Sequence, residues 1–196
     1  MLMMLGFEIF SQLQRLPVKP PVTIAFLGIN IGIHLDPSML GYNNSIFNWI
    51  RGALVGHGRG IIADNCLSLG HVSSYYNRWQ TLPWNRVFLS GLIHADDRHL
   101  YYNMLSFLYK GIYLEQSMGS VAFLTLVMYS WAASALCYLA LNMLYGDGYS
   151  CAVGFSAVIF ALKYVHNHRS PGRTSVWGIS VPTRYAAWLE LVVIQV

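Results

Sequence analysis

The sequence is poor in charged residues. Only 10% of its 196 residues are Asp, Glu, Lys or Arg, whereas soluble domains carry about 25%. Residues 116–146 contain none of these four residue types, and the run exceeds the roughly 20 apolar residues that a membrane-spanning helix needs. The shortage of charge therefore argues against an ordinary soluble domain and predicts an integral, multi-pass membrane protein.

Long apolar runs other than this one are also scarce. The remaining candidates are shorter or interrupted, and they cover residues 20–35, 98–113, 152–164 and 183–196. No cleavable signal peptide is expected, because the first apolar run is broken at Glu8 and no small-residue cleavage site follows. We therefore expect an all-α, polytopic membrane helix bundle of four or five spans. Residues 1–19 would be a cytoplasmic segment and residues 20–196 the transmembrane domain.

Basic residues concentrate in two segments, and this sets the expected topology. Arg15 and Lys19 precede the first span, and residues 163–184 carry four basic residues and no acidic one. Cytoplasmic loops are enriched in Lys and Arg, so both segments are expected in the cytoplasm. The loop of residues 36–93 and the short loop around Asp147 then lie on the far side. The net charge of +4 is thus a topology signal, and no nucleic-acid partner is expected.

Cysteine is scarce as well, with three in the chain. The topology places Cys66 and Cys151 on the far side and Cys137 in a span. A Cys66–Cys151 disulfide is one option in an oxidising compartment, but spacing does not decide pairing, and three free thiols are the favoured interpretation. The same far-side loop contains the sequence Asn43-Asn44-Ser45, which makes Asn43 a glycosylation candidate.

Three polar residues are expected at similar depth from the far side. His99 and Asn103 are spaced i, i+4, so they share one helix face. With Asp96 held at the interface, a rise of about 1.5 Å per residue puts them about 3 and 9 Å deep. Counted in the same way from Cys151, Ser156 is about 7–8 Å deep. Lipid offers no hydrogen bonds, so all three must face protein or a water-filled cavity.

Several functions are open to such a cluster. On spacing alone, helix packing is the favoured interpretation, since polar side chains commonly bond across membrane helices. A zinc protease is disfavoured because His94 and His99 do not form His-Glu-x-x-His, and no metal is expected. Gly154-Phe155-Ser156-Ala157 lacks the second glycine of a nucleophile elbow. A polar transport pathway through His99 and Asn103 is a further alternative.

Taken together, the motifs resemble those of the rhomboid intramembrane serine proteases. They are His-x-x-x-Asn at His99 and Asn103, Gly-x-x-x-Glu-x-x-x-Gly-Ser at residues 111–120, and Gly-x-Ser ending at Ser156. The resemblance extends from about the first span to the last residue. The final stretch, "VPTRYAAWLELVVIQV", is most similar to the eukaryotic subgroup that includes endoplasmic-reticulum rhomboids and some plant rhomboid-like proteins.

This resemblance implies a role for each motif. Ser156 would be the nucleophile of a Ser-His dyad, and His99 and Asn103 would help to hold the oxyanion. His94 would lie at the mouth of the site. The remaining motif residues would be structural, and they are Gly111, Glu115, Gly119 and Gly154. Substrates would be single-pass or polytopic membrane proteins met within the lipid, and no cofactor, metal or nucleic acid would take part.

The sequence departs from the family at the base. The family's base is a histidine on a sixth span, but none of the seven histidines here matches it, and the sequence ends at Val196 inside the fifth apolar stretch. We therefore expect a C-terminally truncated chain with about five of six core spans, inactive as it stands. The alternative is a catalytically inactive relative, similar to inactive rhomboids or derlins, that binds membrane clients for degradation. The endoplasmic reticulum is the expected location, with a mitochondrial membrane as the alternative.

Overall fold

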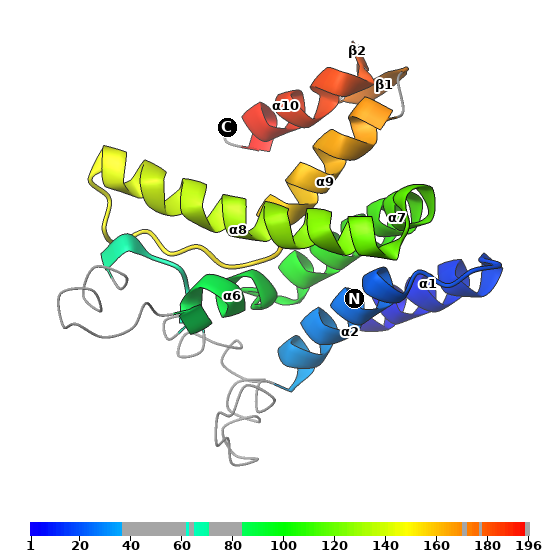
Figure 1. Ribbon diagram of the computed structural model, residues 1–196, viewed down its shortest axis with the longest axis horizontal. Helices are drawn as coiled ribbons and strands as arrows, with labels where there is room; N and C mark the ends of the chain where they lie inside the picture. Colours follow the sequence, from blue (N-terminus) through cyan, green and yellow to red (C-terminus); the bar gives the residue numbers. More distant parts are fainter. Residues whose placement is uncertain (37–61, 63–64, 71–83, 170–171, 177, 195–196) are drawn as a thin grey trace.

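The computed structural model describes residues 1–36, 62, 65–70, 84–169, 172–176 and 178–194. Helix α9 packs against three other helices, one of which is the helix that follows it in the chain (Figure 1). These four helices are α7 (Asp97–Met118), α8 (Ser120–Tyr145), α9 (Ser156–Arg169) and α10 (Thr183–Ile194). The all-α membrane bundle expected from the sequence is confirmed.

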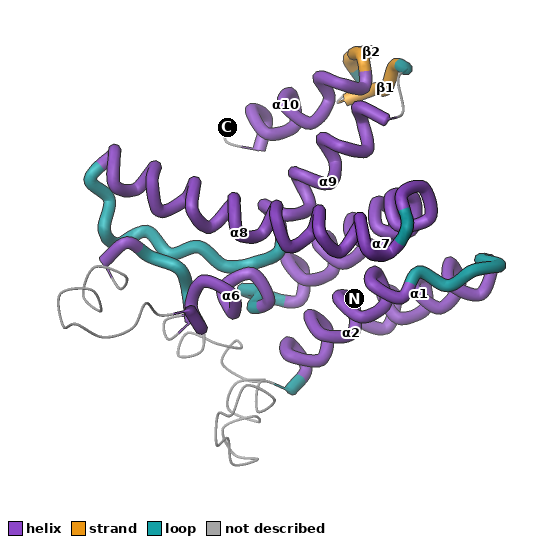
Figure 2. The backbone as a smooth tube through the Cα atoms, viewed as in Figure 1, coloured by secondary structure: helices purple, strands orange, loops and turns teal. Residues whose placement is uncertain are grey.

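Of the other elements, α1, α2 and α6 lie on one side of this group and the two strands lie at its opposite end (Figure 2). Both N-terminal helices pack against α7, and a short helix before α7 contacts α2 and α8. The two short strands form an antiparallel hairpin between α9 and α10, with Arg173 opposite Pro182. The bounds are α1 (Leu2–Arg15), α2 (Pro21–Leu35), α6 (Trp84–Leu92), β1 (Arg173–Val176) and β2 (Ile179–Pro182).

Each predicted apolar span overlaps a helix of the structure, but the predicted and observed boundaries do not always agree. Among the described helices, α8 alone is both long enough, at 26 residues, and apolar enough, with a mean hydropathy of 1.6, to cross a membrane. Helix α2 is apolar but shorter. The predicted span at residues 152–164 is wrong at its start, because α9 begins at Ser156. Gly154 has a φ of +104°, which is incompatible with a right-handed helix. The depth of Ser156 is therefore set by a non-helical segment rather than by helical rise.

A cluster of buried aromatic rings joins the helices next to Ser156. Phe155 is fully buried, and its ring centroid lies 5.6 Å from that of Phe26, 5.3 Å from Phe107 and 5.5 Å from Trp131. Close packing of this kind is a main source of stability between helices in lipid, and aromatic pairs contribute about 0.5–1.5 kcal/mol each. Contacts to α2, α7 and α8 therefore fix the residue that precedes the serine.

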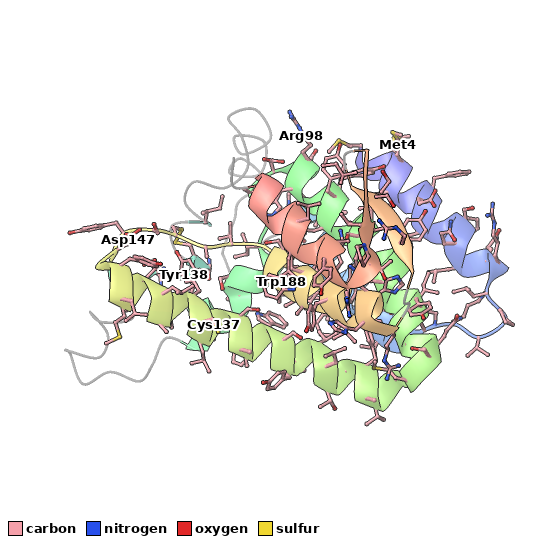
Figure 3. All side chains as sticks on the ribbon, turned by 90° about the horizontal axis from the view of Figure 1, so that it is seen from above. Met4, Arg98, Cys137, Tyr138, Asp147 and Trp188 are labelled. Carbon is pink, nitrogen blue, oxygen red and sulfur yellow. A yellow bond between two sulfur atoms is a disulfide. The ribbon has the colours of Figure 1, made fainter. Side chains whose placement is uncertain are left out.

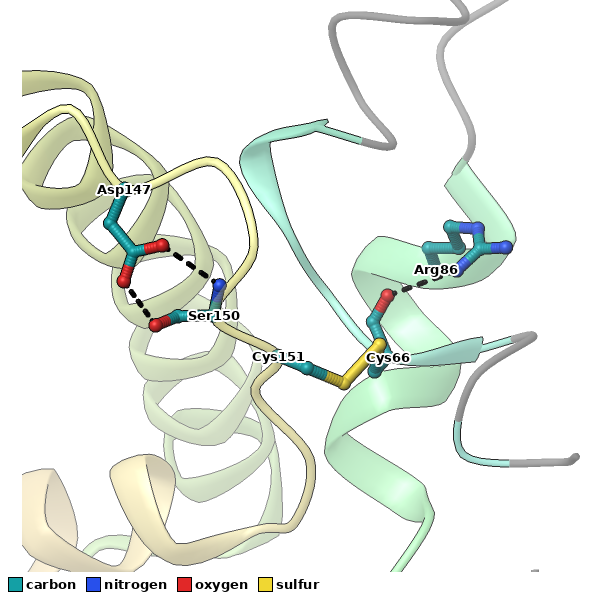
Figure 4. The surroundings of a disulfide bond; sticks show 5 residues. All are labelled: Cys66, Arg86, Asp147, Ser150 and Cys151. Carbon is teal, nitrogen blue, oxygen red and sulfur yellow. Dashed lines mark hydrogen bonds between the residues drawn. A yellow bond between two sulfur atoms is a disulfide. The ribbon is translucent and has the colours of Figure 1, made fainter. Parts of the chain in front are cut away.

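A disulfide links two loops that lie far apart in the sequence. Cys66 and Cys151 are bonded, with their Cα atoms 5.5 Å apart and a sequence separation of 85 (Figure 4). Cys137 is a free, exposed thiol on α8 (Figure 3). The favoured interpretation of three free thiols is thus wrong, because the fold brings together two loops whose distance in space the spacing does not reveal. The glycosylation candidate Asn43 lies outside the described residues.

Glu115 caps the first turn of α2 from the neighbouring helix. Its buried carboxylate accepts from Val22 N at 2.9 Å, from Thr23 N at 2.8 Å and from Thr23 Oγ1 at 2.7 Å. The first N–H groups of a helix have no partner within it, and a negative charge there also meets the positive end of the helix dipole. Glu115 therefore fastens α7 to the start of α2.

The two glycines of the same motif have separate tasks. A Cβ on Gly111 would lie 2.6 Å from Thr23 Oγ1, so only glycine lets α7 approach α2 this closely. Gly119 is the C-cap of α7, with a φ of +84°, and α8 begins at the next residue. The motif therefore joins α7 to both α2 and α8.

Candidate active site

The N-terminus of α7 positions His99. Asp96 is the N-cap of the helix, and its Oδ1 accepts from the backbone N–H groups of Arg98 and His99, each at 2.8 Å. The hydrogen bond from His99 N is the main cause of a pKa of Asp96 below the usual range. The ionised Asp96 carboxylate thus provides the hydrogen-bond acceptor for the free N–H groups of the first helical turn. His99 belongs to this turn.

The hydrogen bonding of His99 indicates which ring nitrogen carries the proton. His99 Nδ1 accepts from Ala95 N at 3.4 Å. A neutral imidazole that accepts at Nδ1 carries its proton on Nε2. That nitrogen faces Gly154, because a Cβ built on Gly154 would lie 2.7 Å from Nε2. His99 therefore presents an N–H donor to the segment that leads to Ser156.

Asn103 adds a second donor at the same place. Its Nδ2 would lie 3.5 Å from the same Cβ position on Gly154, and it is buried without a hydrogen-bond partner. Gly154 is itself held by its N–H, which donates to Ser90 O at 2.8 Å. A buried amide without a partner is uncommon and costs about 1–3 kcal/mol. A ligand that accepts hydrogen bonds would remove this cost.

Ser156 is the first residue of α9, next to a small cavity. The first helical hydrogen bond runs from Ile159 N to Phe155 O, so the N–H of Ser156 is not used within the helix. Ser156 lines a cavity of about 110 Å³ together with Gly91, Ser134 and other residues. The structure therefore provides a hydroxyl, a helix N-terminus and space beside them.

The remaining predictions for the site concern the base next to Ser156, the position of His94 and the absence of a metal site. No imidazole is hydrogen-bonded to Ser156 in the part of the chain that the structure describes. His94 is buried, with its ring centroid 5.1 Å from that of His99 and its Nδ1 3.2 Å from Leu92 O. Its place at the mouth of the site stays a prediction. Among the described residues, no three His, Cys, Asp or Glu side chains are grouped to hold a metal ion.

Sequence reasoning missed several residues that support the site. Thr23, Phe155 and Ser134 carry no motif of their own, and their importance depends on contacts between distant segments. Asp96 offered a signal, because an acidic residue directly before a helix is a common N-cap. For the backbone pairing of residues 65–70 with the loop before Ser156, the one signal in the sequence was the possible Cys66–Cys151 disulfide, and spacing alone did not favour it.

Comparisons with known proteins identify relatives of this chain. The family model described as "Rhomboid domain" matches residues 81–196. Rhomboid-related protein 4 of Homo sapiens is 37% identical over 184 residues, which cover 90% of this chain and 50% of that protein. Rhomboid-like protein 14, mitochondrial, of Arabidopsis thaliana is 36% identical over 203 residues, which cover 100% of this chain and 54% of that protein.

The chain thus spans about half the length of the curated relatives it matches. No solved structure matches it. The family model covers more than half of the chain, and the two relatives match along nearly all of it. The chain therefore belongs to the rhomboid family.

Proposed function

We propose that the protein is an intramembrane serine endopeptidase that cleaves transmembrane segments of membrane proteins, with Ser156 as the nucleophile. The observation that carries the proposal is the convergence of His99 Nε2 and Asn103 Nδ2 on Gly154, two residues before Ser156. Both groups are N–H donors, and one is buried without a partner. Acyl transfer needs such donors where negative charge develops.

The proposed reaction uses each of these groups. Ser156 Oγ attacks the peptide carbonyl, and its proton passes to a base. The carbonyl oxygen becomes an oxyanion, which accepts from His99 Nε2–H, Asn103 Nδ2–H and the N–H of Ser156 at the start of α9. The base then gives its proton to the leaving nitrogen, the C–N bond breaks and the amine product is released, and water hydrolyses the acyl-enzyme. No metal or cofactor is needed for these steps.

A serine hydroxyl is a weak nucleophile at neutral pH without an adjacent base. The family resemblance gives this role to none of the histidines present, and His99 is engaged as a donor. We propose that the base of the Ser-His dyad comes from sequence outside these 196 residues. In a serine protease, loss of a dyad member costs on the order of 10⁶ in turnover, so residues 1–196 alone are expected to be inactive.

A second candidate is a rhomboid-family protein that binds membrane clients for degradation without cleaving them. It is favoured by one observation, the lack of any imidazole bonded to Ser156 within the described residues. The N–H donors of His99 and Asn103 that face Gly154 argue against this candidate, because a protein that only binds clients needs no oxyanion donors. Labelling of Ser156 separates the two candidates.

The proposed location is the endoplasmic reticulum, with a mitochondrial membrane as the alternative. The Cys66–Cys151 disulfide supports a site that faces an oxidising compartment, because cytosolic thiols are kept reduced. The alternative, a mitochondrial membrane, is supported by one relative, which carries the word mitochondrial in its name. Localisation of the tagged protein by microscopy distinguishes the two membranes.

The test of function is labelling of the full-length protein with a fluorophosphonate, followed by mass spectrometry of the labelled peptide. We expect the label on Ser156 and its loss in Ser156→Ala. Ser134→Ala is the matched control, because Ser134 lines the same cavity and its Oγ donates to Ser130 O. Equal labelling of wild type and Ser156→Ala, or a label on Ser134, would refute the assignment.

A further inference from the structure

We propose that residues 65–70, named here the clamp segment, position Ser156 and are locked by the Cys66–Cys151 disulfide. Reduction of this disulfide would then lower the reactivity of Ser156. The inference rests on the proposed function of Ser156 as the nucleophile. The clamp itself is a separate structural feature that can be measured without any reaction.

The clamp segment pairs with the loop before Ser156 through its backbone. Leu67 N donates to Ala152 O at 3.0 Å, and Ala152 N donates to Leu67 O at 2.9 Å. Gly70 N donates to Gly148 O at 2.9 Å. The disulfide joins the residues directly next to the first pair. Four links therefore fasten residues 148–152 to a segment about 80 positions earlier.

The short helix α6 completes the attachment. The buried side chain of Arg86 donates to Cys66 O at 3.2 Å (Figure 4). Ser90 O accepts from Gly154 N at 2.8 Å. One helix thus contacts both the clamp segment and the residue that faces the donors of His99 and Asn103.

Between the local turn in which Asp147 Oδ1 accepts from Tyr149 N and Ser150 N and the buried Phe155, the loop before Ser156 is held mainly by these links. Residues 147–155 form no helix, and their only strand-like pairing in the described part of the chain is the bridge from Ala152 to Leu67. The clamp segment also reaches the cavity beside the serine, where Leu67 and Ala152 are lining residues. A loosened clamp would therefore change both the position of Gly154 and the shape of the cavity.

Thiol–disulfide exchange can act on this lock. Cys151 is exposed, whereas Cys66 is buried. A thiolate of a small dithiol attacks Cys151 Sγ, which breaks the S–S bond and releases the Cys66 thiolate. The second thiol of the reagent then displaces Cys151. The reagent is oxidised to a cyclic disulfide, and the protein gains two electrons and two protons as two thiols.

The experiment compares oxidised and dithiothreitol-treated full-length protein in detergent. Alkylation followed by peptide mapping should find Cys137 alkylated and Cys66 and Cys151 protected before reduction, and all three of these cysteines alkylated after it. We expect the rate of fluorophosphonate labelling at Ser156 to fall about 10²-fold on reduction, the loss that a displacement of about 1 Å can cause. Reoxidation should restore the rate, while far-ultraviolet circular dichroism stays unchanged.

Variants separate positioning from general damage. Cys66→Ser and Cys151→Ser should label slowly and ignore the reductant, whereas Cys137→Ser should behave as wild type. Gly70→Ala disturbs the clamp without touching a thiol, because the new Cβ would lie 2.7 Å from Gly148 O. It should label more slowly than Gly28→Ala, whose Cβ would meet nothing within 4 Å.

Hydrogen exchange gives a readout that needs no reactive serine. The amides of Leu67 and Ala152 should exchange faster after reduction, while amides in α8 should not. Unchanged exchange at these two amides, alkylation of Cys66 and Cys151 in untreated protein, or an unchanged labelling rate after proven reduction would each overturn the clamp. If Ser156 fails to label even in oxidised protein, the proposed function fails, and the exchange result still decides the clamp.

Discussion

The two ends of α7 hold their buried polar groups in different ways. Near the C-terminal end, the Glu115 carboxylate accepts three hydrogen bonds from the first turn of α2. Near the N-terminal end, Asn103 Nδ2 of α7 and His94 Nε2 in the segment just before α7 are buried without a partner. An unsatisfied buried group costs about 1–3 kcal/mol. The satisfied end stabilises the fold, whereas the unsatisfied end is suited to a ligand that brings acceptors.

A glycine is required near each end of α7, and the physical reason differs between the two ends. Gly111 lets α7 and α2 approach each other, which is a matter of packing. Gly154 adopts a left-handed φ of +104° and lies against the His99 ring, which is a matter of site geometry. Substitutions at the two positions should therefore separate stability from reactivity.

The largest effect is expected for Gly154→Ala. The new Cβ would lie 2.5 Å from His99 Cε1, so the ring must move away from the oxyanion position. Loss of one oxyanion donor typically lowers the rate about 10²–10³-fold. The rate of fluorophosphonate labelling at Ser156 measures this loss.

The control for Gly154→Ala is Gly178→Ala. Gly178 has a φ of +83° and open space around it, so this variant carries backbone strain without the clash. Its labelling rate should equal that of wild type. If Gly154→Ala labels at the wild-type rate, the contact between Gly154 and the His99 ring does not matter for the reactivity of Ser156.

A smaller effect, on stability rather than reactivity, is expected for Gly111→Ala. The added methyl would overlap the Thr23 side chain at 2.6 Å, and overpacking of this kind costs about 1–3 kcal/mol. Denaturant unfolding in mixed micelles measures the loss. Gly28→Ala, with nothing within 4 Å of its Cβ, should unfold like wild type; if both variants lose stability equally, the close approach at Thr23 is not the cause.

The smallest effect is expected at the N-cap of α7. Asp96→Ala should cost about 1 kcal/mol, the usual value for a lost cap. Because the pKa of Asp96 is lowered in the folded protein, its charge contributes stability above the unfolded pKa of about 3.9. This contribution is lost as pH falls through the lower, folded pKa.

Unfolding measured between pH 7 and pH 3 tests the cap. Wild type should lose stability at the acid end of this range, where Asp96 begins to take up its proton. Asp96→Asn should keep most of the stability at pH 7, since Asn also caps well, but lack that part of the acid dependence. An identical acid profile for Asp96→Asn and wild type would assign the pH effect to other carboxylates.

The sequence predicted the membrane bundle and the neighbourhood of the site, because composition and motif spacing are local properties. The structure brings His99 and Asn103 against Gly154, two residues before Ser156, whereas the predicted group was His99, Asn103 and Ser156, and the roles of these residues stay predictions. The start of α9 at Ser156 was missed, because a glycine with left-handed φ does not differ in the sequence from one that packs helices. The Cys66–Cys151 bond and the Glu115–Thr23 contact join positions 85 and 92 residues apart, and no local pattern reports such distances.

The most direct test of the difference between the two ends of α7 is the Ser156 labelling rate per folded molecule, compared between Asn103→Ala and Glu115→Gln. We expect Asn103→Ala to lower this rate about 10²–10³-fold with little change in unfolding. Glu115→Gln should keep the rate while losing about 1.5–3 kcal/mol of stability, the contribution of hydrogen bonds to a charged group. A wild-type rate in Asn103→Ala, or an equal fall in both variants, would contradict the account.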